Sequence, residues 1–230
     1  MKPNWENDNI KLYHADCRDV IPFLSNIDAV VTDPPYGIGE SNKKNLSRGK
    51  LAKQIDYGNI AIDYPDEEEW DKQPPDDELI QKLRSISKYQ IIFGGNYFHL
   101  PPTKCWLVWD KQQTGDFADC ELAWTNLNKA VRRITYLWNG MIKQEPEKRY
   151  HLTQKPLKVM EWCLSHLPKD VNIILDPFAG SGTTVIACIK QNKKCIAIEK
   201  GKNNFDNMVM RVKHELREEL IGYKKGFKIF

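Results

Sequence analysis

Residues 172–200 read "NIILDPFAGSGTTVIACIKQNKKCIAIEK" and contain the clearest structural pattern of the chain. An apolar strand ends at Asp176, a turn with two glycines follows, and a helix begins near Thr183. A second strand then ends at Glu199. This succession predicts a βαβ unit with two parallel strands, and such sheets bind ligands at the carboxyl ends of their strands.

Short apolar runs alternate with helical patterns in the rest of the chain as well. This alternation indicates repeated βαβ units, and therefore an α/β fold with a mainly parallel sheet and helices on both faces. Strands are expected at residues 10–16, 28–33, 89–95, 105–110, 120–125, 133–138, 172–176 and 194–199. Apolar stripes with helical spacing predict helix faces at Leu79, Ile80, Leu83 and Ile86, at Leu157, Met160, Leu164 and Leu167, and at Phe205, Met208, Val209, Val212 and Leu216.

The composition is that of an ordinary globular protein, with 230 residues of which 41% are hydrophobic and 28% are charged. The start, "MKPNWENDNI", has no apolar signal core, and no apolar run approaches the ~18 residues that span a membrane. We therefore expect a cytoplasmic protein without membrane contact. The six cysteines and five histidines are scattered without a CxxC pair, so neither a metal site nor a disulfide framework is expected.

One region does not follow the alternating pattern. Residues 40–56 are rich in lysine and arginine among Ser, Asn and Gly, and residues 63–78 are acidic and broken by prolines. Long loops inside compact domains are usually functional or disordered. We predict a single domain over residues 1–230 that carries a loop insertion at about 40–75.

The glycine loop and the acid after it indicate the class of ligand. Glycines let the backbone approach a ligand, and Glu199 follows Gly180 by the roughly 20 residues at which an acid accepts from ribose hydroxyls. Val185 stands where the third glycine of a dinucleotide fingerprint would be, and no Lys-Ser/Thr pair follows the glycines. A ligand with a ribose and no phosphate fits better, and S-adenosylmethionine has that property. A tight turn without a ligand is the alternative.

A second motif, "VVTDPPYGIG" at residues 30–39, ends another apolar strand. Pro34 and Pro35 cannot donate to a sheet ladder, so the strand must stop near Asp33. The prolines therefore hold the carboxylate of Asp33 close to the ring of Tyr36. Alone, this motif could be a strand-terminating turn, but beside the glycine loop we interpret it as catalytic.

These motifs resemble those of the amino-directed DNA methyltransferases, which methylate exocyclic nitrogens of adenine or cytosine. "TDPPYG" resembles their catalytic motif, "LDPFAGSGTT" their cofactor loop, and "HLTQKP" (151–156) the segment at the methionine end of the cofactor. The resemblance covers about residues 10–215. The catalytic motif precedes the glycine loop, as in the circularly permuted subgroup of this family, and this order favours DNA over RNA or protein as the substrate.

The resemblance implies a Rossmann-like fold that transfers a methyl group from S-adenosylmethionine to a base flipped out of DNA. Asp33 and the backbone carbonyl of Pro34 would accept hydrogen bonds from the exocyclic amine, and Tyr36 would stack on the base. In this family, Asp before Pro-Pro-Tyr favours adenine N6 as the methylated atom. The resemblance also implies a role in a restriction-modification system. Cytosine N4 is the alternative, and a catalytically inactive relative that binds DNA or cofactor is a second one.

The resemblance also implies roles at the cofactor. Asp16 would lie near the cofactor adenine, although it could instead cap the following helix. Lys155 would pair with the cofactor carboxylate or be a solvated lysine, and Phe178 would pack near the adenine or in the core. The expected cofactor-binding residues are Asp16, Asp33, Lys155, Asp176, Phe178, Ala179, Gly180, Gly182, Thr183, Thr184, Glu199 and Lys200.

DNA contact is expected from two basic groups, because the net charge of +3 is too small to indicate it by itself. The first group lies in the loop that directly follows the catalytic motif, where it would contact DNA phosphates. A solvated loop is the alternative. A short recognition segment is expected at about 139–150, and its small size favours a short target or a partner subunit, as in a homodimer. The first group is Lys43, Lys44, Arg48, Lys50 and Lys53; the second is Arg132, Arg133, Lys143, Lys148 and Arg149, interleaved with Tyr136, Trp138 and Tyr150.

Overall fold

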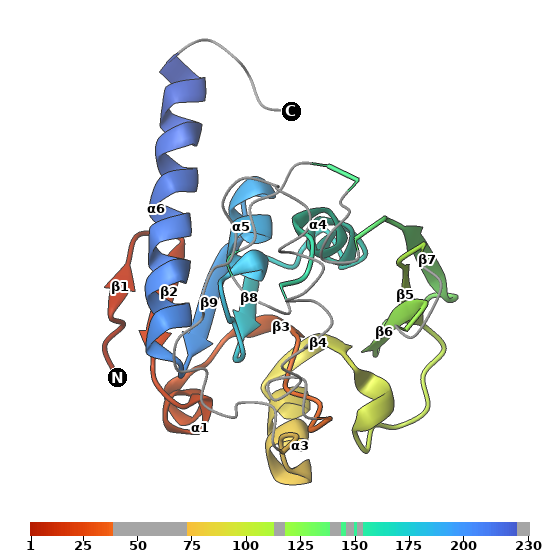
Figure 1. The fold of residues 1–230 in the computed structure, drawn as a ribbon. Coiled ribbons are helices and arrows are strands. Elements are labelled where there is room, and N and C mark those ends of the chain that lie inside the picture. The colour runs from red at the N-terminus through yellow and green to blue at the C-terminus, as the bar shows by residue number, and fades with distance from the viewer. Residues whose placement is uncertain (39–72, 113–117, 139–143, 146–149, 151–153, 225–230) are drawn as a thin grey trace, which may run out of the picture. The chain divides into compact units, whose positions relative to one another are not determined.

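The computed structural model describes residues 1–38, 73–112, 118–138, 144–145, 150 and 154–224. The chain forms two compact units, one of residues 1–34 together with 76–230 and one of residues 35–75. Within the described residues, the larger unit contains a nine-stranded sheet flanked by helices (Figure 1). No helix in these residues has the length and apolar character that crossing a membrane requires.

The sheet is mixed but mainly parallel, as the sequence predicts. Its strand order is β1-β2-β9-β8-β3-β4-β6-β5-β7. The five strands from β2 to β4 in this order run parallel, and β6 runs antiparallel to both β4 and β5. The strands are β1 (Trp5–Glu6), β2 (Ile10–His14), β3 (Ile27–Thr32), β4 (Ser87–Phe93), β5 (Trp106–Asp110), β6 (Cys120–Thr125), β7 (Arg132–Thr135), β8 (Ile173–Asp176) and β9 (Lys194–Glu199).

Every expected strand is present, with ends that shift by up to three residues. The short strand β1 was not predicted, because two residues are too few to show an alternating pattern. Strand β7 ends at Thr135, so Tyr136 and Trp138 lie beyond it.

The helices follow the predicted apolar stripes. Asp76 begins α3 by accepting a hydrogen bond from the Leu79 N–H at 2.9 Å, which satisfies a donor that the first turn leaves unpaired. Ile86 and Leu167 lie just past the ends of α3 and α4. The helices are α1 (Cys17–Val20), η1 (Ile21–Phe23), α3 (Asp77–Ser85), η3 (Gly95–Tyr97), α4 (Leu157–Ser165), α5 (Thr183–Lys190) and α6 (Lys202–Lys224).

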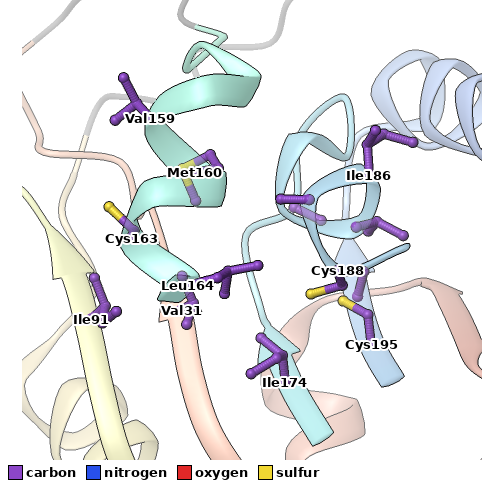
Figure 2. Packing of buried hydrophobic residues seen from close by; sticks show 14 of the residues in the cluster. Val31, Ile91, Val159, Met160, Cys163, Leu164, Ile174, Ile186, Cys188 and Cys195 are labelled. Carbon is purple, nitrogen blue, oxygen red and sulfur yellow. The ribbon is translucent and has the colours of Figure 1, made fainter. Parts of the chain in front are cut away.

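Both faces of the sheet are covered, as the sequence also predicts. Ala29 and Val31 of β3 belong to the cluster that includes side chains of α4, α5 and α6. Val30 points the other way, into a cluster with α1 and α3. Successive strand residues face opposite sides, so a strand buried on both faces has a continuous apolar sequence. Figure 2 shows Val31 and Leu164 in the first of these clusters.

The connections change direction between the neighbouring strands β8 and β3. From β8 the chain passes through α5 to β9 on one side, whereas the chain after β3 returns through α3 to β4 on the other. Open α/β sheets bind ligands at the carboxyl ends of the strands where the connections diverge in this way. Asp176 ends β8 and Asp33 follows β3, so both motifs meet at this point.

The smaller unit begins at Pro35. Gly37 has a φ of +73°, and a Cβ at this position would collide with Pro74 of the same unit. A glycine is therefore required where the two ends of this unit approach each other. The basic residues Lys43, Lys44, Arg48, Lys50 and Lys53 lie outside the described residues.

Candidate active site

Asp176 connects β3 to the glycine loop through hydrogen bonds. The Thr32 hydroxyl donates to Asp176 Oδ1 at 2.7 Å, and the Phe178 N–H donates to the same oxygen at 3.2 Å. Burial raises the pKa of Asp176 to about 6, although hydrogen bonds from Thr184 and Thr32 oppose the rise. Phe178 itself is half-buried against the cluster on the α1 and α3 face.

The glycine loop has one packed side and one open side. Gly182, with a φ of +82°, lies so close to Met208 of α6 that a Cβ would collide with it. Gly180 has a φ of +52°, and no heavy atom of the described residues lies within 4 Å of a Cβ built on it. Ala179 donates its N–H to the Ile198 carbonyl at 3.0 Å, which fixes the loop to β9. The loop therefore leaves room for a ligand at Gly180.

Glu199 lies at the end of β9, beside this loop. Its carboxylate accepts from the Gly180 N–H at 2.8 Å and from the Gly201 N–H at 2.6 Å. Burial raises the pKa of Glu199 to about 7, and these backbone hydrogen bonds limit the rise. The predicted role as a ribose acceptor is not tested by these contacts, but they place the carboxylate next to the open glycine.

Asp16 follows β2, the neighbour of β9, by two residues, and it caps α1. Its carboxylate accepts from the Arg18 N–H at 3.0 Å and lies 3.3 Å from Lys200 Nζ. Burial opposes ionisation, but the hydrogen bond from Arg18 and the Lys200 ammonium lower the pKa of Asp16 overall. The capping role left open by the sequence is therefore present, and a contact of Asp16 or Lys200 with a cofactor stays a prediction.

Lys155 is buried between carboxylates, so the solvated alternative is wrong. Its ammonium forms an ion pair with Asp33 and a second one with Glu121 Oε2 at 3.1 Å, and it lies 5.3 Å from the centre of the Phe93 ring. Burial lowers the pKa of Lys155, but the Asp33 and Glu121 charges outweigh burial and raise it overall. The ammonium is thus charged and lies beside the predicted catalytic acid. Its pairing with a cofactor carboxylate stays a prediction.

Helix α6 supports the glycine loop through Arg211. The buried guanidinium donates to the Ser181 carbonyl at 2.8 Å and to the hydroxyls of Ser181 and Thr183 at 3.1 and 3.3 Å. It also lies 4.5 Å from the centre of the Tyr150 ring. Arg211 therefore connects the loop to the end of the expected recognition segment.

Comparison with known proteins identifies the family. A sequence profile described as DNA methylase matches residues 102–210. The Type II methyltransferase M2.DpnII of Streptococcus pneumoniae is 35% identical over 252 residues, covering 87% of this chain and 88% of that protein. The chain belongs to the N6/N4 DNA methylase family. M.HindIII of Haemophilus influenzae, another Type II methyltransferase, is 32% identical over 102 residues, which cover 44% of this methylase and 33% of that protein.

Solved structures confirm the predicted methyltransferase fold. PvuII DNA methyltransferase (cytosine-N4-specific) matches this methylase with a TM-score of 0.59 at 14% identity, over 92% of this chain and 89% of that one. The M1.HpyAVI–SAM complex matches with a TM-score of 0.53 at 23% identity, over 88% and 99% of the chains. At these identities the likeness concerns the fold. Circular permutation stays a prediction from the motif order.

Of the two basic residues of β7, Arg132 lies apart from this site, whereas Arg133 contacts Asp110 at the end of β5. Arg132 pairs with Leu107, near the start of β5, whereas β3, β8 and β9 end at the opposite edge of the sheet. Arg133 is exposed and lies 3.6 Å from Asp110 Oδ2. The interleaved aromatics do not form a surface for bases, because Tyr136 and Trp138 are buried in the core. Lys143, Lys148 and Arg149 lie outside the described residues.

A hollow of about 400 Å³ lies at the edge of the sheet where β4 and β5 begin, and it is lined in part by Arg84, Lys88, Lys104 and Trp124. None of the predicted site residues that the structure describes lines it. The candidate active site of the methylase is thus defined by its contacts at the carboxyl ends of β3, β8 and β9, and this hollow is no part of it.

Sequence reasoning missed Glu121, Lys111 and Arg211. Glu121 shares a strand face with Ala123 and Thr125, which are fully buried, and an acid at such an inward position was a usable signal. Arg211 follows Met208 by three residues within the apolar stripe of α6, where a cation also needs a buried partner. The short polar segment around Lys111 shows no comparable pattern.

Proposed function

We propose that this methylase transfers a methyl group from S-adenosylmethionine to the exocyclic N6 amine of adenine in DNA. The observation that carries the proposal is the position of Asp33. It directly follows β3, next to the strand that leads into the glycine loop, and it forms an ion pair with buried Lys155. An acceptor for an amine and a loop open to a ligand are thereby adjacent.

The residues present fit S-adenosylmethionine. The open side of Gly180 offers room for the ligand, and the Glu199 carboxylate beside it can accept from ribose hydroxyls. Asp176, Ala179, Thr183 and Thr184 surround the same loop. When bound, this cofactor supplies a methyl group on a positively charged sulfur.

Asp33 would do the chemical work of the protein. An exocyclic amine is a weak nucleophile because its lone pair is delocalised into the base ring. A carboxylate that accepts from the N–H localises that pair on nitrogen and stabilises the positive charge that develops there. The lone pair would form the new N–C bond, the electrons of the broken C–S bond would stay on sulfur, and Asp33 would accept the amine proton. The Pro34 carbonyl would be a second acceptor.

Two further assignments support DNA and adenine. Tyr36 offers a flat face worth ~1–3 kcal/mol to an unstacked base. Asp before Pro-Pro-Tyr favours adenine. PvuII DNA methyltransferase, which has a similar fold, is cytosine-N4-specific, so cytosine N4 is the second candidate. The Type II names of the relatives support a role in restriction-modification. A homodimer stays a prediction.

Product analysis tests this proposal. The protein is incubated with methyl-labelled cofactor and mixed-sequence DNA, the DNA is digested, and the labelled nucleoside is identified by mass. We expect N6-methyladenine. N4-methylcytosine would change the base and leave the mechanism intact, whereas 5-methylcytosine, or label found only in RNA or protein, would refute it.

The variant Asp33→Asn tests the acceptor. We expect its turnover to fall by roughly 10²–10³-fold, because a neutral amide stabilises developing positive charge far less than a carboxylate does. Asp28→Asn is the matched control: Asp28 lies on the same strand and accepts from the N–H groups of Asn172 and Ile173, away from the carboxyl ends. Turnover of Asp33→Asn at the wild-type rate, with both variants folded, would show that the motif is only a turn.

A further inference from the structure

Four charged side chains alternate in sign along one row at the site. Lys111, directly after β5, forms an ion pair with Glu121 Oε1. Glu121 Oε2 lies 3.1 Å from Lys155 Nζ, which in turn pairs with Asp33 Oδ2. Each side chain is largely shielded, with exposed fractions of 16% for Lys111, 21% for Glu121, 9% for Lys155 and 24% for Asp33. The row connects strand β6 to the predicted acceptor.

The Lys155 ammonium has a direct consequence for Asp33. A cation bound to a carboxylate competes with any other donor for the same oxygens, so the strength of the Lys155–Asp33 pair sets how well Asp33 can accept from an amine. In a poorly solvated site, water screens this competition only weakly. A second carboxylate beside the same ammonium reduces this competition, because the cation is then shared. Glu121 occupies that position.

We propose that Glu121 is a positioning residue for methyl transfer: it shares and holds the Lys155 ammonium, and so keeps Asp33 available to the substrate amine. Lys111 supports this role by holding the other oxygen of Glu121. The inference rests on the proposed function, because it assigns Asp33 the acceptor role. Glu121 lies outside the three motifs on which the family resemblance is based.

The first test is Glu121→Gln, which preserves shape and removes the charge. We expect kcat to fall roughly ten- to hundredfold, the scale of losses from displaced catalytic groups, with little change in the KM for DNA. Glu215→Gln is the matched control, since Glu215 pairs with Lys190 at 2.6 Å and its side chain has the same exposed fraction of 21%. An unchanged kcat in Glu121→Gln, or an equal loss in Glu215→Gln, would overturn the proposal.

A double-mutant cycle separates positioning from general stability. If Glu121 acts through Lys155, then Glu121→Gln should have no further effect on kcat in a Lys155→Met background. A purely structural contribution would instead reduce kcat by the same factor in both backgrounds. Equal factors would therefore refute the proposal.

A second readout needs neither methyl transfer nor the Lys155→Met variant. The amine of Lys155 can be titrated by NMR in ¹⁵N-lysine-labelled wild type and Glu121→Gln, with Lys155→Arg to assign its signal. Asp33, Glu121 and the Cys163 thiol face Lys155, and burial raises the pKa of Cys163, so that it adds no charge. We expect Lys155 in Glu121→Gln to lose its proton at lower pH, because one of two carboxylates that raise its pKa is gone.

Identical NMR titrations in the two proteins would show that Glu121 does not share the ammonium, and would overturn the inference. A wild-type protein that methylates no base would refute the proposed function instead. The two failures are thus distinguishable.

Discussion

At the scale of single residues, Glu199 holds the glycine loop and is also the predicted acceptor for the cofactor ribose. Its carboxylate holds the N–H groups of Gly180 and Gly201, so it shapes the loop before any ligand arrives. Burial raises its pKa to about 7, so the carboxyl changes charge near neutral pH. An ionised carboxylate accepts stronger hydrogen bonds than a neutral carboxyl, so the predicted ribose role of Glu199 implies cofactor binding that depends on pH.

We expect the affinity for S-adenosylmethionine to rise as the pH increases through about 7, where Glu199 becomes ionised. Glu199→Gln should remove this rise and weaken binding by ~1.5–3 kcal/mol per lost charge-assisted bond, or roughly ten- to 150-fold. Calorimetry with both proteins at several pH values measures this. The cofactor's own amino group titrates equally in both experiments, so the difference isolates Glu199. Parallel curves of equal affinity would exclude the ribose role.

At the scale of elements, α6 holds the glycine loop from the side opposite the ligand space. Met208 packs against Gly182, and Arg211 binds the Ser181 carbonyl and two hydroxyls of the loop. The shape of the loop therefore depends in part on a helix that follows it in the chain. Because a loop shaped in advance binds its ligand without a further ordering cost, α6 should contribute to cofactor affinity.

Arg211→Met should therefore lower both stability and cofactor affinity. Removing a buried charged donor leaves the Ser181 carbonyl unpaired, which costs about 1–3 kcal/mol of unfolding free energy. Arg217→Met, an exposed position of the same helix, is the matched control and should change neither quantity. Denaturant unfolding and calorimetry measure the two effects. Wild-type affinity in a folded Arg211→Met protein would contradict the role of α6.

At the scale of the whole molecule, the sheet assembles the site from distant parts of the chain. Asp33 and Lys155 are 122 residues apart in sequence and form an ion pair. The parallel strands place the ends of β3, β8 and β9 at one edge of the sheet. Arg132, the first residue of β7, lies at the other edge. We therefore expect DNA contact near the reacting groups from the residues that follow the catalytic motif directly, and not from Arg132.

Neutralising the basic loop should weaken DNA binding at every sequence and flatten its salt dependence. Each lost phosphate contact should reduce the slope of log affinity against log salt by about 0.9. Fluorescence anisotropy with labelled DNA at several salt concentrations measures the slope. The loop variant replaces Lys43, Lys44, Arg48, Lys50 and Lys53 by Gln; the control variant replaces the exposed Lys2, Lys11, Lys82, Lys169 and Lys213. Equal slopes in the two variants would show that the loop is solvated and does not contact the DNA phosphates.

Local patterns in the sequence were sufficient for most of the elements and for the family. Alternating or continuous apolar runs predicted the strands, helical stripes predicted α3, α4 and α6, and the motifs at Asp33 and Gly180 predicted a methyltransferase. These features depend on neighbours within one element, so they can be read along the chain. The burial of Tyr136 and Trp138 shows the limit of such patterns, because sequence spacing alone does not show that these two aromatics pack into the core.

Only the tertiary structure decided which charges meet. The row from Lys111 through Glu121 and Lys155 to Asp33 uses residues that follow or lie on different strands, and it depends on β6 running antiparallel between β4 and β5. Likewise, Arg211 reaches Ser181 because α6 packs beside α5. Strand order and helix packing result from burying all apolar faces together, and no local pattern specifies the side-chain contacts that follow from them.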